Sequence, residues 1–127
     1  MIDERLMRTQ LMLGKQGIEN LKHATVAIIG VGAVGGYAME ALARAGVGKL
    51  ILVDFDVFEP SNINRQILAL SSTLGQKKVI VAQNRVKEIN SDCEVILKDI
   101  FITHDNIDKI LELKPDYVVD AIDSIKE

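Results

Sequence analysis

A glycine-rich turn between two apolar segments constrains this chain more than any other feature. The apolar run Thr25–Ile29 leads directly into Gly30-Val-Gly32-Ala-Val-Gly35, and a helical pattern over Ala33–Ala45 precedes a second apolar run, Lys49–Val53. Glycines at this spacing allow a tight turn, close approach of the backbone to a phosphate and close packing of the following helix. The N-terminus of that helix adds N–H donors and partial positive charge. The pattern therefore predicts the strand, turn, helix and parallel strand of a nucleotide-binding unit.

The remaining sequence continues this alternation of strands and helices. Further elements are expected as follows: helices over 2–13, ending near Gly14, and over 18–22; a helix carrying Val79, Ala82, Val86 and Ile89; a strand at Glu94–Leu97; a helix at Asp105–Leu113; and a strand at Tyr117–Ala121. Strands without polar alternation are covered on both faces. The predicted fold class is α/β, a Rossmann-like doubly wound parallel sheet preceded by N-terminal helices.

Length and composition limit the class of protein. The 127 residues suit one small domain, and 15 Lys and Arg against 18 Asp and Glu give a net charge of -3, which is not the charge of a broadly basic nucleic-acid-binding face. The single cysteine, the acidic N-terminal start and an apolar stretch of only 14 residues, Val26–Met39, favour a cytoplasmic protein without a membrane anchor. Because the sequence ends four residues after Asp123, we expect a domain truncated at its C-terminus, an N-terminal half.

The segment after the second apolar run carries more polar chemistry than nucleotide docking requires. Asp54 lies 24 positions after Gly30, where a carboxylate can accept both ribose hydroxyls. The chain then runs through Asn62, Asn64 and Arg65 before helical periodicity resumes, whereas a dehydrogenase normally enters its next helix after a short connection. The guanidinium of Arg65 suits a triphosphate, and the two amides can hold the loop or contact phosphate oxygens. This segment favours ATP chemistry over hydride transfer, with an ordinary surface loop as the alternative.

Two further positions are candidates for contacts with a bound nucleotide. Lys78 falls in the first turn of a predicted helix, where the helix dipole disfavours a cation unless an anion lies nearby. Asp123 follows the fourth predicted strand, at the sheet edge where ligands bind, and a carboxylate there suits Mg²⁺ together with phosphate oxygens. Solvated lysines and a helix-capping aspartate remain the alternatives. His23 and His104 lack partner residues at the spacing of a metal site or a triad, and a lone cysteine that begins a strand, Cys93, is usually a packing residue, so we assign none of the three a role.

Taken together, these motifs resemble the ThiF/MoeB/HesA superfamily of ubiquitin-activating-type adenylyltransferases. The resemblance spans essentially the whole chain. It is carried by Arg5-Leu-Met-Arg8-Thr-Gln10, the Gly30–Gly35 turn, Asp54-Phe-Asp56, Ser61-Asn-Ile-Asn-Arg-Gln66, Gly75-Gln-Lys-Lys78 and Asp120-Ala-Ile-Asp123. Sulfur-carrier activators of this family usually have Gln at the position of Asn64 and Asn at that of Ser124. These two departures resemble the branch that dehydrates threonylcarbamoyladenosine in tRNA to its cyclic form.

The resemblance implies specific roles and partners. Residues 1–127 would be the N-terminal nucleotide-binding part of a ThiF-type adenylyltransferase domain that uses ATP and Mg²⁺ to activate a carboxylate. The implied nucleotide contacts are Gly30, Gly32, Gly35, Asp54, Asp56, Asn62, Arg65, Gln66 and Lys78, with Arg65 and Lys78 neutralising phosphoryl charge and Asp123 holding the metal. Arg8 would reach the triphosphate of a neighbouring subunit, which implies a homodimer. The tRNA would bind through the full-length protein, and this fragment alone is expected to be inactive.

Three further functions are compatible with the same motifs. An adenylyltransferase that activates the C-terminal glycine of a ubiquitin-like sulfur carrier, with a sulfur-transfer partner protein, would share every nucleotide contact named above. A non-catalytic nucleotide-binding or dimerisation module is the second. An NAD-dependent oxidoreductase is a distant third, because the segment from Asp54 to Gln66 has no purpose in hydride transfer.

Overall fold

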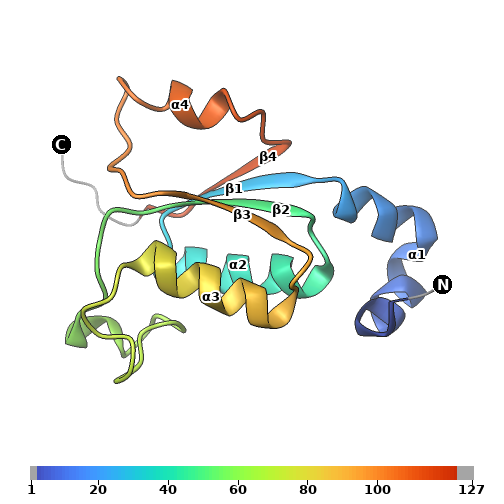
Figure 1. Cartoon of the computed structure of the whole chain (residues 1–127), viewed down its shortest axis with the longest axis horizontal. Coiled ribbons are helices and arrows are strands. Elements are labelled where there is room, and N and C mark those ends of the chain that lie inside the picture. Colours follow the sequence, from blue (N-terminus) through green and yellow to red (C-terminus); the bar gives the residue numbers. More distant parts are fainter. Residues whose placement is uncertain (1–2, 123–127) are drawn as a thin grey trace.

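The computed structural model describes residues 3–122, which form one parallel four-stranded sheet flanked by helices (Figure 1). The strands are β1 (Thr25–Ile29), β2 (Lys49–Val53), β3 (Glu94–Lys98) and β4 (Tyr117–Asp120), in the order β3-β2-β1-β4. The chain therefore leaves β1 in one direction for β2 and β3 and in the other for β4. A crevice forms at such a switch point, outside the carboxyl ends of the strands, and that is where open α/β sheets bind ligands.

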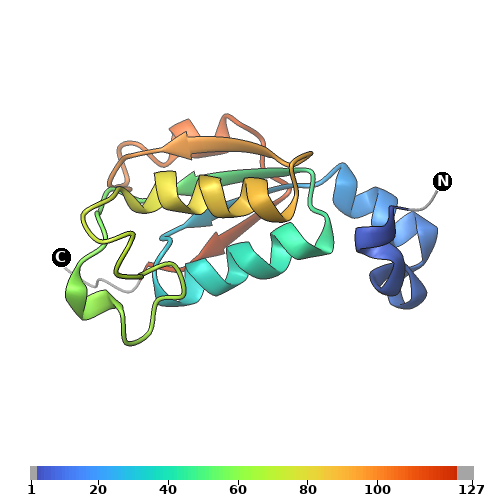
Figure 2. The same cartoon turned by 60° about the horizontal axis from the view of Figure 1, so that its bottom comes forward.

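Helices lie on both faces of the sheet, as the sequence predicts for a doubly wound fold. The helices α2 (Ala33–Ala45) and α3 (Lys78–Ile89) run side by side below the sheet in Figure 1, and α4 (Asp108–Leu111) lies above it. Figure 2 shows the same two long helices crossing in front of the sheet. Alternate strand residues enter two apolar clusters, Val26 and Ile28 with α2 and α3, and Ala27 and Ile29 with α4. The predicted α/β class, the parallel sheet and the N-terminal helices are all confirmed.

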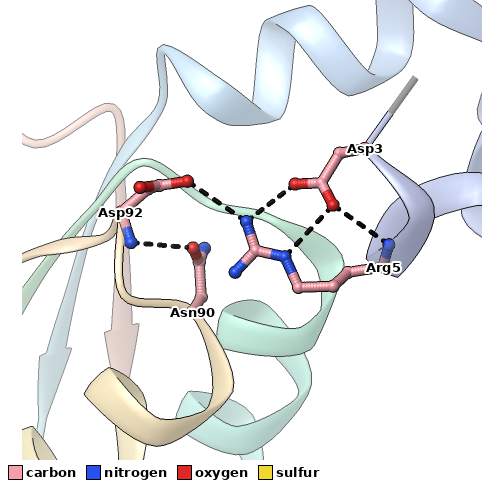
Figure 3. Close-up of polar contacts among 4 residues, drawn as sticks. All are labelled: Asp3, Arg5, Asn90 and Asp92. Carbon is pink, nitrogen blue, oxygen red and sulfur yellow. Dashed lines mark hydrogen bonds and ion pairs between the residues drawn. The ribbon is translucent and has the colours of Figure 1, made fainter. Parts of the chain in front are cut away.

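The N-terminal helical segment lies beside the amino ends of the strands, opposite the ligand-binding edge (Figures 1 and 2). It consists of η1 (Glu4–Leu6) and α1 (Met7–Lys22), and the predicted interruption falls at Gly14, whose φ of 74° is not helical. The Arg5 guanidinium ties this segment to the start of β3, because it binds Asp3 at 2.7 Å and Asp92 at 3.1 Å (Figure 3). None of the helices within residues 3–122 is long and apolar enough to cross a membrane.

The helix predicted at Asp105–Leu113 is shorter than expected. Only Asp108–Leu111 is regular α-helix, preceded by turns. The reason is local competition for hydrogen bonds, since the Asn106 carboxamide bonds backbone groups of the preceding loop. Lys114 then adopts a φ of 56°, a conformation that ends a helix. The bounds of the four strands and of α2 and α3 agree with the predicted ones to within about a residue. The N-terminal helices predicted over 2–13 and 18–22 are instead a 3-10 turn at Glu4–Leu6 and a helix at Met7–Lys22 that is interrupted at Gly14.

A partly buried ion cluster joins α2 to α3. The Glu40 carboxylate, with a side chain only 12% exposed, accepts hydrogen bonds from Arg44 at 2.9 Å and from Arg85 at 2.8 and 2.9 Å. Hydrogen bonds from Arg85 in the first place, and from Arg44, hold the pKa of the Glu40 carboxyl below its ordinary value, although burial acts in the opposite direction.

Replacing Arg85 with methionine should destabilise the fold in a pH-dependent way. We expect a loss of about 1–3 kcal/mol near neutral pH, because a partly buried carboxylate loses charged donors. Since the pKa of Glu40 is lower in the folded than in the unfolded state, this stabilisation is present above the unfolded pKa and disappears as pH falls through the folded pKa. Urea unfolding at neutral and acidic pH measures the effect. Arg5→Met, which breaks an exposed ion pair, is the control and should cost about 0–1 kcal/mol. If the free energy of unfolding of Arg85→Met stayed below that of wild type by the same amount in acid, the ionised Glu40 carboxylate would not be the source of the stabilisation.

Candidate nucleotide-binding site

The carboxyl ends of the strands surround an open pocket. Six of the residues predicted to contact a nucleotide line it, namely Gly30, Gly32, Asp54, Asp56, Gln66 and Lys78. They come from the turn after β1, from the loop after β2 and from the start of α3. Residues that are up to 48 positions apart in the sequence (Gly30 to Lys78) thus meet at one edge of the sheet.

The turn after β1 leaves no room for side chains at two of its glycines. Gly30 has a φ of 97°, and a Cβ atom there would lie 2.7 Å from the carbonyl oxygen of Ala121. A Cβ atom at Gly35 would lie 1.6 Å from the carbonyl oxygen of Gly30. Gly35 therefore serves the close approach of α2 to the turn, behind the pocket wall. The turn is further held by the Gly30 N–H, which donates to the Val53 carbonyl at 2.8 Å.

The Asp54 carboxylate fastens the glycine turn to the end of β2. One oxygen accepts the Val31 N–H at 2.8 Å, and the other accepts the Asp56 N–H at 2.9 Å. A carboxylate has about four acceptor positions, so each oxygen keeps capacity for another donor. Asp54 can therefore organise the turn and accept hydroxyl donors from a ligand at the same time.

The long polar segment closes on itself, which brings Lys78 beside Asp56. The Lys78 N–H donates to the Asp56 carbonyl at 3.0 Å, and the Phe58 N–H donates to the Gln76 carbonyl at 3.0 Å. Lys78 is only 6% exposed, and its ammonium lies 5.4 Å from the centre of the Phe58 ring. Within residues 3–122 no carboxylate forms an ion pair with it. By contrast its neighbour Lys77, half-exposed, binds Asp99 at 2.6 Å.

Gln66 lies under the glycine turn. Its side chain is buried, and a Cβ atom at Gly32 would be 3.4 Å from the Gln66 amide nitrogen. The amide oxygen is buried without a hydrogen-bond partner in the described part of the chain. The carboxamide thus places a neutral polar group against the backbone that the motif assigns to phosphate binding.

Within residues 3–122, Asn62, Arg65 and Arg8 do not line this pocket. Asn62 holds the loop, because its side-chain oxygen accepts the Glu59 N–H at 2.9 Å in a short 3-10 helix, η2 (Pro60–Asn62). Arg65 is exposed and donates to the Ser61 carbonyl at 3.0 Å and to Asn64 at 2.9 Å. Arg8 is an exposed residue of α1, the helix that lies beside the amino ends of the strands in Figure 1. Asp123, the predicted metal ligand, lies outside the described residues, as does Ser124.

One side of the pocket, which is apolar, consists of residues that the sequence motifs had not indicated as ligand contacts. It is lined by the apolar side chains Phe55, Ile100, Phe101 and Ile102. Phe55 stood within the motif Asp54-Phe-Asp56, and the other three directly follow β3. The rule that ligands lie at the carboxyl ends of parallel strands would have indicated them.

Cys93 has no part in this site. The residue is fully buried at the start of β3, and burial raises the pKa of its thiol. A buried thiol of this kind packs as a small apolar group, the role expected for a lone cysteine beginning a strand.

The parallel sheet, the glycine turn after β1 and the acidic residue after β2 define a Rossmann-like α/β fold, a class in which such a turn commonly meets a nucleotide. Residues 4–127 match the ThiF family, and the chain belongs to that family. The family resemblance seen in the sequence motifs is thereby confirmed.

The chain is similar over most of its length to several named proteins and solved structures. The chain is 48% identical over 118 residues to the tRNA threonylcarbamoyladenosine dehydratase of Bacillus subtilis (strain 168), covering 93% of this chain and 46% of that protein. It is 41% identical over 113 residues to the adenylyltransferase and sulfurtransferase MOCS3 of Culex quinquefasciatus, covering 89% and 26%. The crystal structure of E. coli tRNA N6-threonylcarbamoyladenosine dehydratase in complex with ATP matches with a TM-score of 0.94 and 37% identity, over 97% of this chain and 51% of that one. The chain spans about half the length of the dehydratases it matches.

Proposed function

We propose that this chain is the N-terminal nucleotide-binding part of an ATP-dependent tRNA threonylcarbamoyladenosine dehydratase. The observation that carries the proposal is the likeness, over 97% of the chain, to the E. coli dehydratase in complex with ATP. The pocket supports it independently, because a buried lysine ammonium without a carboxylate partner in residues 3–122 suits an anionic ligand. The proposed ligand is ATP, with the triphosphate toward Gly30, Gly32 and Lys78.

The proposed reaction activates a carboxylate by adenylation. An oxygen of the threonylcarbamoyl carboxylate attacks the α-phosphorus of ATP, and the bond to pyrophosphate breaks. The acyl adenylate then cyclises with loss of AMP, so that the nucleoside has lost one water overall. The chain's own contribution is electrostatic, since fixed donors stabilise charge that develops on the transferred phosphoryl group. Asp54 would orient the ribose, and Lys78 would neutralise phosphate charge.

Arg65 and Mg²⁺ belong to the same proposal. Arg65 would reach the triphosphate after breaking its hydrogen bonds to Ser61 and Asn64. Because these bonds are exposed to solvent, breaking them costs little free energy. Mg²⁺ prefers one or two carboxylates with phosphate oxygens and water, and Asp123, three residues after β4 in the sequence, would supply such a hard oxygen donor. When bound, the ion would offset the negative charge of the triphosphate.

The proposed partners are a second copy of the chain and tRNA, in the cytoplasm. Leu11 and Met12 on α1 are 85% and 87% exposed, an unusual state for two large apolar residues on adjoining positions of a helix. They support a homodimer in which α1, carrying Arg8, packs against the other subunit. A net charge of -3 offers this segment little affinity for tRNA by itself, so the tRNA would be held mainly by the rest of the protein.

The decisive test uses protein containing this chain, ATP and tRNA that bears threonylcarbamoyladenosine. We expect pyrophosphate release and, by mass spectrometry, a nucleoside lighter by one water. Calorimetry should give tighter binding of ATP than of NAD. The second candidate function is activation of a ubiquitin-like sulfur carrier, which the 41% identity to MOCS3 favours. Adenylylation of a sulfur-carrier C-terminus without any tRNA product would select that candidate, and tighter binding of NAD would exclude both.

A further inference from the structure

The first residues of the chain form an arm that is held to the rest of the protein at its outer end. This N-terminal arm, residues 3–13, consists of η1 and the part of α1 that precedes the break at Gly14. Neither η1 nor α1 has a buried residue. A hollow of about 750 Å³ lies between these helices and the ends of α2 and α3. Packing along its length therefore does not fix the orientation of the arm.

Two neighbouring residues of η1 attach the arm to the body of the protein. Leu6 packs against the C-terminal turn of α2, because a Cβ atom at Gly46 would lie 3.1 Å from both Leu6 methyl carbons. The Arg5 guanidinium donates to the Asp92 carboxylate at 3.1 Å, in the turn between α3 and β3 (Figure 3). Among residues 3–122, no other hydrogen bond joins the arm to the chain beyond α1. The contact with Asp92 is thus the polar attachment of the arm.

Asp3 determines the direction in which the guanidinium points. Its two carboxylate oxygens accept hydrogen bonds from Arg5 Nε at 3.1 Å and from Arg5 Nη2 at 2.7 Å, and the same Nη2 donates to Asp92. One Asp3 oxygen also accepts the Arg5 backbone N–H at 3.0 Å. On the other side, the Asp92 N–H donates to the Asn90 side-chain oxygen at 3.2 Å. A two-point contact between a guanidinium and a carboxylate has a defined geometry, so Asp3, Arg5 and Asp92 form a clasp of fixed direction.

The arm carries the residues that the proposed homodimer uses. Arg8 is exposed, and Leu11 and Met12 are almost fully exposed. All three follow Arg5 within about two turns of helix, so the orientation of η1 sets the direction in which they point. An interface whose parts are fixed before association loses less conformational entropy when it forms.

We propose that Arg5 is a positioning residue, which by binding Asp92 holds the arm in the orientation that a second copy of this chain recognises. The proposal rests on the proposed function, since that function includes the homodimer. It goes beyond that function by naming the contact that keeps the arm in place. Arg5 acts through the arm, because η1 lies beside the amino ends of the strands, opposite the nucleotide pocket (Figures 1 and 2).

The test uses the full-length protein that contains this chain and measures the dissociation constant of its dimer by analytical ultracentrifugation. Asp92→Ala removes the acceptor and leaves the sequence of the arm unchanged. Each clasp should contribute about 5-fold to affinity, the upper range for an exposed ion pair. Because a dimer contains two clasps, the dissociation constant should rise by about 25-fold. Asp92→Glu keeps the carboxylate and should restore most of the affinity. Asp105→Ala, which removes an exposed carboxylate from the loop before α4, is the matched control and should change nothing.

Two further measurements separate positioning of the arm from stability of the fold. The Asp92 side chain is 78% exposed, so Asp92→Ala should leave the thermal unfolding midpoint near that of wild type. The clasp joins exposed charges, so the difference in dimer affinity between Asp92→Ala and wild type should shrink as added salt screens them. A substitution that acted only by destabilising the fold would lower the unfolding midpoint together with the dimer affinity.

The outcomes separate the clasp from the proposed homodimer. Wild type that stays monomeric would overturn both. A wild-type dimer from which Asp92→Ala does not differ in affinity would overturn only the clasp. An equal loss of affinity in Asp105→Ala would make net charge the cause and would also overturn the clasp. Should the unfolding midpoint of Asp92→Ala fall, Asp92→Glu decides, because recovery of dimer affinity by the longer carboxylate supports the clasp and failure to recover overturns it.

Discussion

Gly35→Ala should abolish nucleotide binding, with a loss of affinity of at least about 100-fold. A Cβ atom at this position would lie 1.6 Å from the Gly30 carbonyl oxygen, a contact that backbone atoms cannot avoid by a rotamer change. The N-terminus of α2 and the turn at Gly30 must then separate, and with them the N–H groups that we propose face the phosphates. Titration with ATP measures the loss, and urea unfolding measures the accompanying fall in stability.

Gly36→Ala provides the matched control on the same helix. Gly36 is also buried, but a Cβ atom there would meet only the Ile67 methyl group at 3.3 Å, which can move by a few tenths of an ångström. Alanine is also the better helix former, by about 0.5–1 kcal/mol. We expect Gly36→Ala to bind ATP as wild type does. Equal effects of the two substitutions would mean that any bulk in this turn of α2 is harmful, and that the contact with Gly30 is not special.

The sequence allowed the sheet, and the edge at which the predicted site residues gather, to be predicted because both depend on local patterns. Thr25–Ile29 and Lys49–Val53 are each apolar after their first residue, and the strands of the structure have these same bounds. The approach of Asp54 to the glycine turn follows from strand pairing alone, since parallel neighbours end at the same edge. The break at Gly14 is likewise a property of one residue.

Contacts between side chains that are distant in the sequence could not be predicted in this way. The bonds from Arg85 to Glu40 join residues 45 positions apart, and the ring contact between Phe55 and Phe101 likewise joins two separate segments of the chain. Both depend on the rotation of α3 and of the loop after β3, which periodicity does not determine. Arg65 has the right chemistry for a triphosphate, yet its guanidinium lies on its own loop. A motif specifies a residue type near a ligand and not the conformation of that residue before the ligand binds.

Lys78→Met should reduce affinity for ATP and the rate of substrate adenylation by about 100-fold, while Lys77→Met should leave both unchanged. Lys78 is 6% exposed and lines the pocket, and removing one preorganised charged donor typically costs catalysis this much. Methionine keeps the buried stem, so folding should survive. Lys77, the preceding residue, binds Asp99 at the surface, and loss of such a bridge costs about 0–1 kcal/mol of stability.

Comparison of ligands identifies the cause of the Lys78 effect. Because we assign the Lys78 ammonium to phosphate charge, Lys78→Met should weaken the binding of ATP much more than the binding of adenosine. The difference between the two losses of affinity should shrink as added salt screens the charges. Equal weakening of ATP and adenosine would indicate a collapsed pocket. Unchanged ATP binding would mean that the ammonium over the Phe58 ring is a packing feature of α3, and the assignment of the triphosphate to this end of the pocket would be wrong.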